Sequence, residues 1–463
     1  MQKVRCNPVS GSHMPVNRRS LLQAGGVLIG AGLLDSLSPA WSADTFEQFK
    51  PRWMSARLDW KQQSGKTIVL RGLQHRWMTT IVPLLPHFTQ LTGIQVNIQL
   101  KALTQSEASY IADLSTKTST HDVYMVWSLS QAMASKLLEP LDDFVGNPKL
   151  SDPVWWDAND VFPSARSFQV WSDKKQYAMA VTAEAQTLFA NKNLLGARGL
   201  SVPRTMEELL RTARALKTAS TAGIVMRSKP SADASPWSAG GFVFSYGGAI
   251  MTPDGDLALT QPETVEAIEM YGRLLREAGP AGAVNYHKQE CLNDFMSARA
   301  AIGCDTSNVV IDITDTEKSK IASSVVYGTL PSAASRPAKP NMWHWTIGMN
   351  ANSQQKDAAW LFMQWATSKP TCQLAAAMGL ATPRASAWGA SAFQQRFGKQ
   401  AAQAALSNLK AADGDLFKAT WFHPKSQQIL DPFGVAINEV ITGAKSAKLA
   451  LADASSLIEK AIA

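Results

Sequence analysis

The sequence predicts an α/β fold in which strands and helices alternate around a largely parallel sheet. Strand-like runs occupy residues 67–70, 95–100 and 121–127, and apolar side chains alternate along the second of them. Apolar residues at helical spacing fill residues 81–88, and a further helix is expected near residues 107–115. This strand–helix–strand–helix–strand order is typical of α/β proteins with a parallel sheet.

Polar and aromatic residues follow the ends of two of these strands. His75 and Trp77 come after the first strand, and Trp127 ends the third. Ligands of open α/β sheets bind beyond the carboxyl ends of the strands. We therefore predict that these three residues face a ligand. The structural alternative is that His75 caps a helix and that the two indoles cover the core.

The composition is that of a folded protein, and its charged residues are not strongly biased or clustered. The 463 residues are enough for more than one globular unit, and 45% of them are hydrophobic. The net charge is +8, of which residues 1–43 carry +3 and the remainder +5. No dense block of Lys and Arg is present, so the sequence does not predict a nucleic-acid partner.

The first 43 residues resemble an export signal. Arg18 and Arg19 precede a mostly apolar run at residues 21–34, and a small-residue site follows at residues 40–42. The segment NRRSLLQ at residues 17–23 is similar to a twin-arginine signal, with the general secretory route as the alternative. The apolar run is too short for an ordinary membrane span. We expect cleavage and a periplasmic location.

Cysteine and histidine usage predicts no metal site and no cofactor. Cys291, Cys304 and Cys372 remain after the signal, and an odd number leaves either one disulfide with a free thiol or three buried thiols. No Cys-x-x-Cys or His-Glu-x-x-His spacing is present. No Gly-x-Gly-x-x-Gly follows the first strand, and no Gly-x-Ser-x-Gly occurs, so an exported enzyme is the weaker alternative.

The segment at residues 174–210 is the most informative part of the chain. One strand-like run ends at Val181, a polar break containing Glu184 follows, and a second run covers residues 187–190. A helix is then expected to start at Thr205. Its N-cap hydroxyl and a Glu three residues on have the spacing of a capping box.

This order resembles the hinge of periplasmic solute-binding proteins that serve ABC importers, the sugar-binding family that includes maltose-binding protein. The resemblance covers roughly residues 64–445. Other short pieces keep the family's order and spacing: Thr92-Gly93-Ile94, Asp122-Val123, Pro140-Leu141-Asp142, Asn191-Lys192, Ala300-Ala301-Ile302, Trp360 with Phe362, and Pro383-Arg384.

The resemblance implies two α/β lobes of the class II type with a ligand cleft between them. It implies an N-terminal lobe of residues 64–183 and 328–372 and a C-terminal lobe of residues 184–327 and 373–463. It further implies a monomer that closes on a small molecule, a carbohydrate or polyol, and delivers it to an inner-membrane ABC permease without catalysis. An organic acid or an amine is the alternative ligand.

Six further residues are candidate ligand contacts. Glu184 matches the family's hinge acid, and its carboxylate can accept bonds from two hydroxyls. Trp237, Trp343 and Trp345 offer flat faces for the C–H groups of a sugar, and alternation puts the last two on one side of a strand with His344 opposite. Arg384 and Asp305 complete the set. The structural alternatives are a solvated hinge acid for Glu184, core packing for the indoles, an inter-lobe ion pair for Arg384 and a turn cap for Asp305.

Overall fold

The computed structural model describes residues 43–101, 106–126, 129–333 and 336–463. The chain forms two compact units, residues 1–48 and residues 49–463. The predicted export signal lies almost entirely outside the described residues. No described helix is both long enough and apolar enough to cross a membrane.

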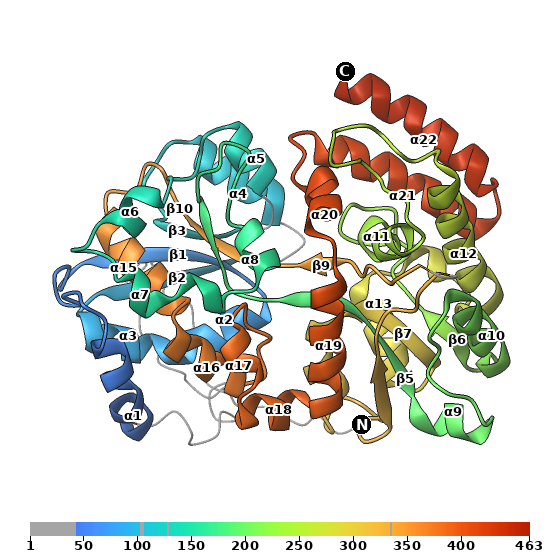
Figure 1. Ribbon diagram of the computed structural model, residues 1–463, viewed down its shortest axis with the longest axis horizontal. Helices are drawn as coiled ribbons and strands as arrows, with labels where there is room; N and C mark the ends of the chain where they lie inside the picture. The colour runs from blue at the N-terminus through green and yellow to red at the C-terminus, as the bar shows by residue number, and fades with distance from the viewer. Residues whose placement is uncertain (1–42, 102–105, 127–128, 334–335) are drawn as a thin grey trace, which may run out of the picture. The chain divides into compact units, whose positions relative to one another are not determined.

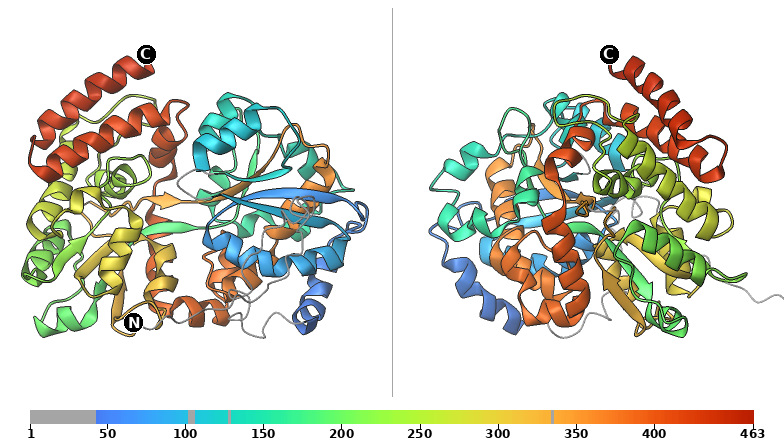
Figure 2. Two further views of the ribbon diagram at one scale, coloured as in Figure 1. Left: turned by 180° about the vertical axis from the view of Figure 1, so that it is seen from behind. Right: turned by 45° about the vertical axis from the view of Figure 1, so that its right-hand side comes forward.

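The first sheet of the larger unit has the strand order β2-β1-β3-β10-β4. Its strands are β1 (Thr67–Leu73), β2 (Gln95–Lys101), β3 (Val123–Val126), β4 (Ala178–Ala180) and β10 (Thr346–Met349). β1 pairs in parallel with β2 and β3, as the strand–helix order predicts, and β10 runs antiparallel to β3 and β4. Helices cover both faces of this sheet (Figures 1 and 2): α2 (Arg76–Ile81) and α3 (Leu85–Thr92) lie on one face, and α4 (Ser106–Ser115) and α5 (Leu129–Ala134) lie on the other.

The second sheet has the order β6-β7-β5-β8, with the short β9 also paired to β5. Its strands are β5 (Glu184–Asn191), β6 (Ala222–Val225), β7 (Ala300–Thr306), β8 (Val325–Gly328) and β9 (Met342–Trp343). The expected N-terminal lobe resumes at residue 328. β8, which ends there, pairs with β5, as does the short β9, and the chain rejoins the first sheet at β10. The hydrogen bonds of the folded chain show to which sheet a strand belongs, and a short apolar run in the sequence does not identify the strand with which it will pair.

Helices and short 3-10 turns make up the rest of the described chain. They are α1 (Ala43–Met54), α2 (Arg76–Ile81), η3 (Val82–Leu84), α3 (Leu85–Thr92), α4 (Ser106–Ser115), α5 (Leu129–Ala134), α6 (Asp142–Gly146), α7 (Pro153–Trp156), η5 (Ala158–Asp160), α8 (Pro163–Ser167), α9 (Lys192–Ala197), α10 (Met206–Leu216), α11 (Ser235–Ser245), α12 (Pro262–Ala278), η6 (Ala283–Asn285), α13 (Lys288–Met296), η7 (Ser307–Val309), α14 (Val310–Ile313), α15 (Lys356–Ala366), α16 (Lys369–Ala377), α17 (Ala385–Trp388), α18 (Ser391–Phe397), α19 (Lys399–Ala411), α20 (Gly414–Trp421), α21 (Ser426–Thr442) and α22 (Ala447–Ile462).

Local signals set several of these boundaries. Gly93 ends α3 with φ +77°, a left-handed conformation that glycine adopts without strain, and its N–H donates to the Thr89 carbonyl. Thr205 and Glu208 form the predicted capping box at the start of α10.

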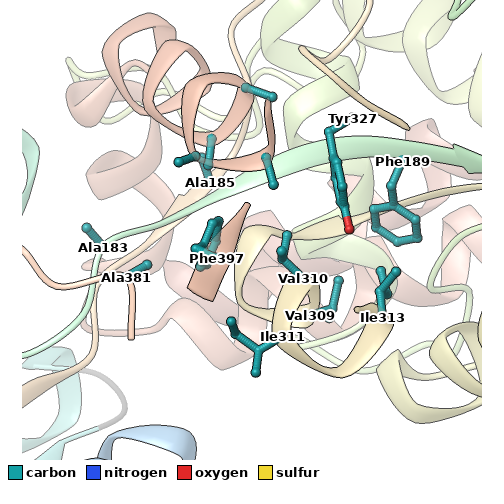
Figure 3. Close-up of a cluster of buried hydrophobic side chains, with 14 of the residues drawn as sticks. Ala183, Ala185, Phe189, Val309, Val310, Ile311, Ile313, Tyr327, Ala381 and Phe397 are labelled. Atoms are coloured by element: carbon teal, nitrogen blue, oxygen red, sulfur yellow. The ribbon is translucent and has the colours of Figure 1, made fainter. Parts of the chain in front are cut away.

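A hydrophobic cluster packs beneath the segment that joins the two sheets (Figure 3). Ala183 and Ala185 of the crossing lie in this cluster with Ala381, Val310 and other apolar residues. Successive side chains of an extended segment point to opposite faces. The residue between the two alanines is therefore directed away from the apolar cluster.

Candidate functional site

A small cavity lies where segments from the two sheets meet. Its volume is ≈ 60 Å³, and it is lined by residues that extend from position 75 to position 345: His75, Glu184, Arg227, Asp233, Trp237, His287, Lys288, Thr306, Trp343 and Trp345. Five residues predicted from the sequence are in this set: His75, Glu184, Trp237, Trp343 and Trp345. The cavity therefore contains charged groups, hydroxyls and indoles together.

Glu184 is the acid at the crossing between the sheets. It begins β5 and is 4% exposed. The Thr182 hydroxyl donates to Oε1 at 3.1 Å, and the Thr306 hydroxyl donates to Oε2 at 2.6 Å. Burial by itself raises the pKa of this carboxyl, but bonds and charges from His75, Lys288 and Thr306 outweigh burial and hold the pKa below its usual range. Glu184 is thus a buried, charged acceptor at neutral pH.

His75 reaches the same carboxylate from the end of β1. Its Nδ1 accepts a bond from the Trp77 N–H at 3.1 Å and caps α2, as the structural alternative anticipated. Its Nε2 faces Glu184 Oε1 at 3.7 Å, and its ring centroid lies 4.8 Å from that of Trp345. Burial lowers the pKa of His75, and the neighbouring Glu184 offsets this only in part. The imidazole is therefore neutral at pH 7.

Trp343 and Trp345 present one indole wall. Their ring centroids are 6.2 Å apart at an interplanar angle of 66°. His344 points the other way, with Nδ1 3.0 Å from the Thr182 carbonyl and Nε2 3.1 Å from the Ser164 hydroxyl. Burial lowers the pKa of His344 to about 4. This is the alternation expected from the sequence, with both indoles on the cavity side.

Arg227 and Trp237 form a second aromatic wall. The guanidinium carbon lies 4.6 Å from the centroid of the Trp237 ring. Arg227 Nε and Nη2 donate to the two carboxylate oxygens of Asp305 at 2.9 and 2.6 Å. Nη1 donates to the Asp233 carbonyl at 2.7 Å. The indole is therefore held by a cation that is itself held by a buried carboxylate.

The third wall comes from the start of α13. His287 Nε2 lies 2.9 Å from Asp233 Oδ2, and this contact contributes to a low pKa of about 2 for Asp233 even though burial opposes it. Lys288 is the first residue of α13 and lies half-buried beside this pair. The three walls and the crossing acid thus supply donors and acceptors around a small space.

Three predicted residues do not line the cavity, and a fourth cannot be placed. Trp77 is buried in α2, where it covers the core. Asp305 lies behind the cavity and orients Arg227. Trp127 is outside the described residues.

Arg384 is the third predicted residue that the structure keeps from the cavity. Its Nε donates to the Thr367 carbonyl at 2.6 Å, and its Nη1 donates to the Asp157 carbonyl at 3.1 Å. Nη1 also lies 3.4 Å from Asp160 Oδ2, and the guanidinium carbon lies 4.5 Å from the Trp156 ring centroid. The side chain is fully buried and serves packing at this crossing.

Sequence reasoning missed Arg227, Asp233, His287, Lys288 and Thr306. Arg227 comes two residues after β6, and Thr306 ends β7. Both lie at carboxyl ends of strands, where ligands of open α/β sheets bind, but at the end of β7 the residue predicted was Asp305 and not its neighbour Thr306. The other three follow no strand directly, and only tertiary packing brings them to the cavity.

Larger hollows lie elsewhere on the second lobe. One of ≈ 860 Å³ is bordered by Glu207, Tyr246 and Lys448, among others, and none of the described candidate residues lines it. We place the functional site at the small cavity because aromatic faces and buried charges converge there. Within the described residues, no group of His, Cys, Asp and Glu is arranged to hold a metal ion. Cys291, Cys304 and Cys372 are all buried free thiols.

Comparisons with known proteins give matches over most of the chain. A sequence profile described as "Bacterial extracellular solute-binding protein" matches residues 73–371. The chain is 28% identical over 406 residues to the erythritol/L-threitol-binding protein of Mycolicibacterium smegmatis, covering 80% of this chain and 81% of that protein. It is 26% identical over 270 residues to the mannitol-binding protein of Pseudomonas aeruginosa, covering 57% of this chain and 60% of that protein.

Solved structures show the same fold. An ABC transporter solute-binding protein from Agrobacterium radiobacter K84, crystallised with ribitol, aligns with a TM-score of 0.76 at 24% identity, covering 86% of this chain and 99% of that one. The two-lobe α/β fold expected from the sequence is confirmed.

Proposed function

Because the chain belongs to the bacterial extracellular solute-binding protein family, we propose that it is the periplasmic substrate-binding component of an ABC importer for an acyclic polyol. In this proposal the protein is exported, binds its ligand without transforming it, and passes it to an inner-membrane permease. The relatives named for erythritol, threitol and mannitol support this ligand class.

The cavity between the sheets is the observation that carries the proposal. A polyol offers C–H groups to indole faces and hydroxyls to charged acceptors and donors. Trp343 and Trp345 supply the first kind of contact, and Glu184 supplies the second.

The position of the cavity also gives a mechanism of closure. His75 belongs to the loop after β1 of the first sheet, whereas Thr306 ends β7 of the second. A ligand held between them contacts both lobes only when the lobes are together, so binding favours that state. We infer that hinge motion at residues 181–184 and at the other crossings admits and releases the ligand.

A ligand screen tests the proposal. The purified protein is titrated with erythritol, ribitol and D-mannitol, with pyranoses, and with organic acids and amines, while the melting temperature is followed. A ligand that binds only the folded state raises this temperature as its concentration exceeds Kd. We expect a rise with at least one acyclic polyol and its loss in Glu184→Gln.

Other outcomes of the screen have different meanings. A rise only with a pyranose, an acid or an amine would retain a solute-binding protein and reject the polyol. No rise with any compound, in protein freed of co-purified ligand by unfolding and refolding, would reject the proposal.

A further inference from the structure

Lys288 is a charged side chain of the cavity whose ammonium group has no hydrogen-bond partner among the described residues. Arg227 is paired with Asp305, Asp233 is paired with His287, and Glu184 accepts bonds from two hydroxyls. Among the described residues, Lys288 makes neither a hydrogen bond nor an ion pair with its ammonium group. Its three donors are therefore available to a ligand.

The place of Lys288 in α13 gives no structural reason for a cation. It is the first residue of this nine-residue helix. The amino end of a helix carries partial positive charge, which disfavours Lys and favours acids. Glu290 in the same turn has the favourable sign, and its carboxylate accepts a bond from the His287 N–H at 3.0 Å. Helix stability therefore does not account for Lys288.

Glu184 is the acid that lines the same cavity as Lys288. The two residues line the same cavity, and the positive charge of Lys288 helps to keep the Glu184 carboxyl ionised. An ammonium group only donates and a carboxylate only accepts. The charges of these two residues balance, so an uncharged ligand leaves the pair neutral, whereas an amine or an acid adds a charge beside it.

We propose that Lys288 determines specificity by donating to one hydroxyl of an uncharged polyol while a second hydroxyl of the same molecule donates to Glu184. This inference rests on the proposed function and adds to it the selection of neutral polyols against amino-polyols. A hydroxyl serves as donor and acceptor and so satisfies both groups. An ammonium substituent in its place cannot accept from Lys288 and is repelled by it.

Isothermal titration of the full-length protein tests the inference. The probes are D-mannitol, ribitol and erythritol, together with 1-amino-1-deoxy-D-mannitol. Lys288→Met removes the charge and retains most of the side-chain length, and Lys288→Arg retains the charge. Lys460→Met, at an exposed position near the end of α22, is the matched control.

We expect Lys288→Met to weaken binding of the preferred neutral polyol by about 10- to 100-fold, the effect of losing one charged hydrogen bond. We also expect the preference for mannitol over its amine to fall by about tenfold, because Glu184 is then no longer balanced. Lys288→Arg should retain that preference, and Lys460→Met should behave as wild type.

The results separate this inference from the proposed function. Wild-type binding of a polyol with unchanged affinity and unchanged discrimination in a folded Lys288→Met protein would overturn the role of Lys288 and leave the polyol receptor standing. A Lys288→Met protein that loses affinity equally for mannitol and the amine would also overturn it, since a merely structural role predicts that pattern. Absence of polyol binding in the wild type would overturn both.

Discussion

Replacing Asp305 by Asn should lower the free energy of unfolding more than the same replacement at the surface does. Asp305 is 3% exposed and Arg227 is 7% exposed, and two hydrogen bonds of 2.9 and 2.6 Å join them. The variant keeps the shape of the side chain but leaves the guanidinium charge buried without its counter-ion. Breaking a buried pair in this way costs about 3–5 kcal/mol.

Asp312→Asn is the matched control for this change. Asp312 Oδ1 pairs with Arg76 Nη2 at 2.9 Å, but the two side chains are 29% and 23% exposed. Pairs that water still reaches contribute little, about 1 kcal/mol or less, because solvent screens both charges. Urea unfolding at pH 7, followed by tryptophan fluorescence, should therefore show a loss several-fold larger for Asp305→Asn than for Asp312→Asn.

The comparison also tests the reasoning about the cavity. Arg227 is held over Trp237 by Asp305, so Asp305→Asn should weaken ligand binding even where the protein remains folded. Equal and small losses of unfolding free energy in the two variants would refute the argument. In that case the charge of Arg227 would be satisfied by the Asp233 carbonyl and by solvent.

Three further predictions concern His344, the Arg76–Asp312 ion pair and the buried cysteines. The free energy of unfolding should fall as the pH drops from about 6.5 to about 4, because His344 is protonated in the unfolded state but stays neutral in the folded state, where its pKa is about 4. The loss should approach about 3 kcal/mol. Urea titrations at several pH values should show this dependence in the wild type and not in His344→Gln. Arg76→Met should speed ligand release by a few-fold in stopped-flow measurements. Arg76 follows β1 of the first sheet and its partner Asp312 follows β7 of the second, so this ion pair joins the two lobes. An unchanged release rate would show that the pair does not hold the lobes together. The internal cysteines should resist a thiol reagent until the protein unfolds, since burial raises the pKa of Cys291, Cys304 and Cys372; peptide mapping showing rapid native labelling at any of them would contradict this.

Selectivity in this site would come from pairing charges before the ligand arrives. Three of its ionised groups are engaged by protein partners, Arg227 with Asp305, Asp233 with His287, and Glu184 with Thr306. Such groups cost little to reorganise on binding, and they orient the indoles and the acceptor in advance. The remaining unmatched donor, Lys288, is the group with most to gain from a ligand oxygen.

Local chemistry in the sequence predicted much of the framework. The capping box at Thr205 and the alternation of Trp343 and Trp345 about His344 each depend on residues within a few positions of one another. Such short-range geometry follows from backbone dihedrals and side-chain periodicity, so it can be read without knowing the fold. Glu184 was predicted on different grounds, from the resemblance of the hinge segment to a known family.

Tertiary structure decided which residues share the site. Arg384 had the chemistry of a ligand contact, but its donors bind Thr367 and Asp157, which lie 17 and 227 positions away. Lys288 carried no local signal, because a lysine at the start of a helix becomes a candidate only when Glu184 and two indoles are seen beside it. The sequence by itself determined the elements and the acid at the crossing. Only the packed fold determined which charged residues pair across long separations in the chain. This pairing decides which donors and acceptors remain available to a ligand.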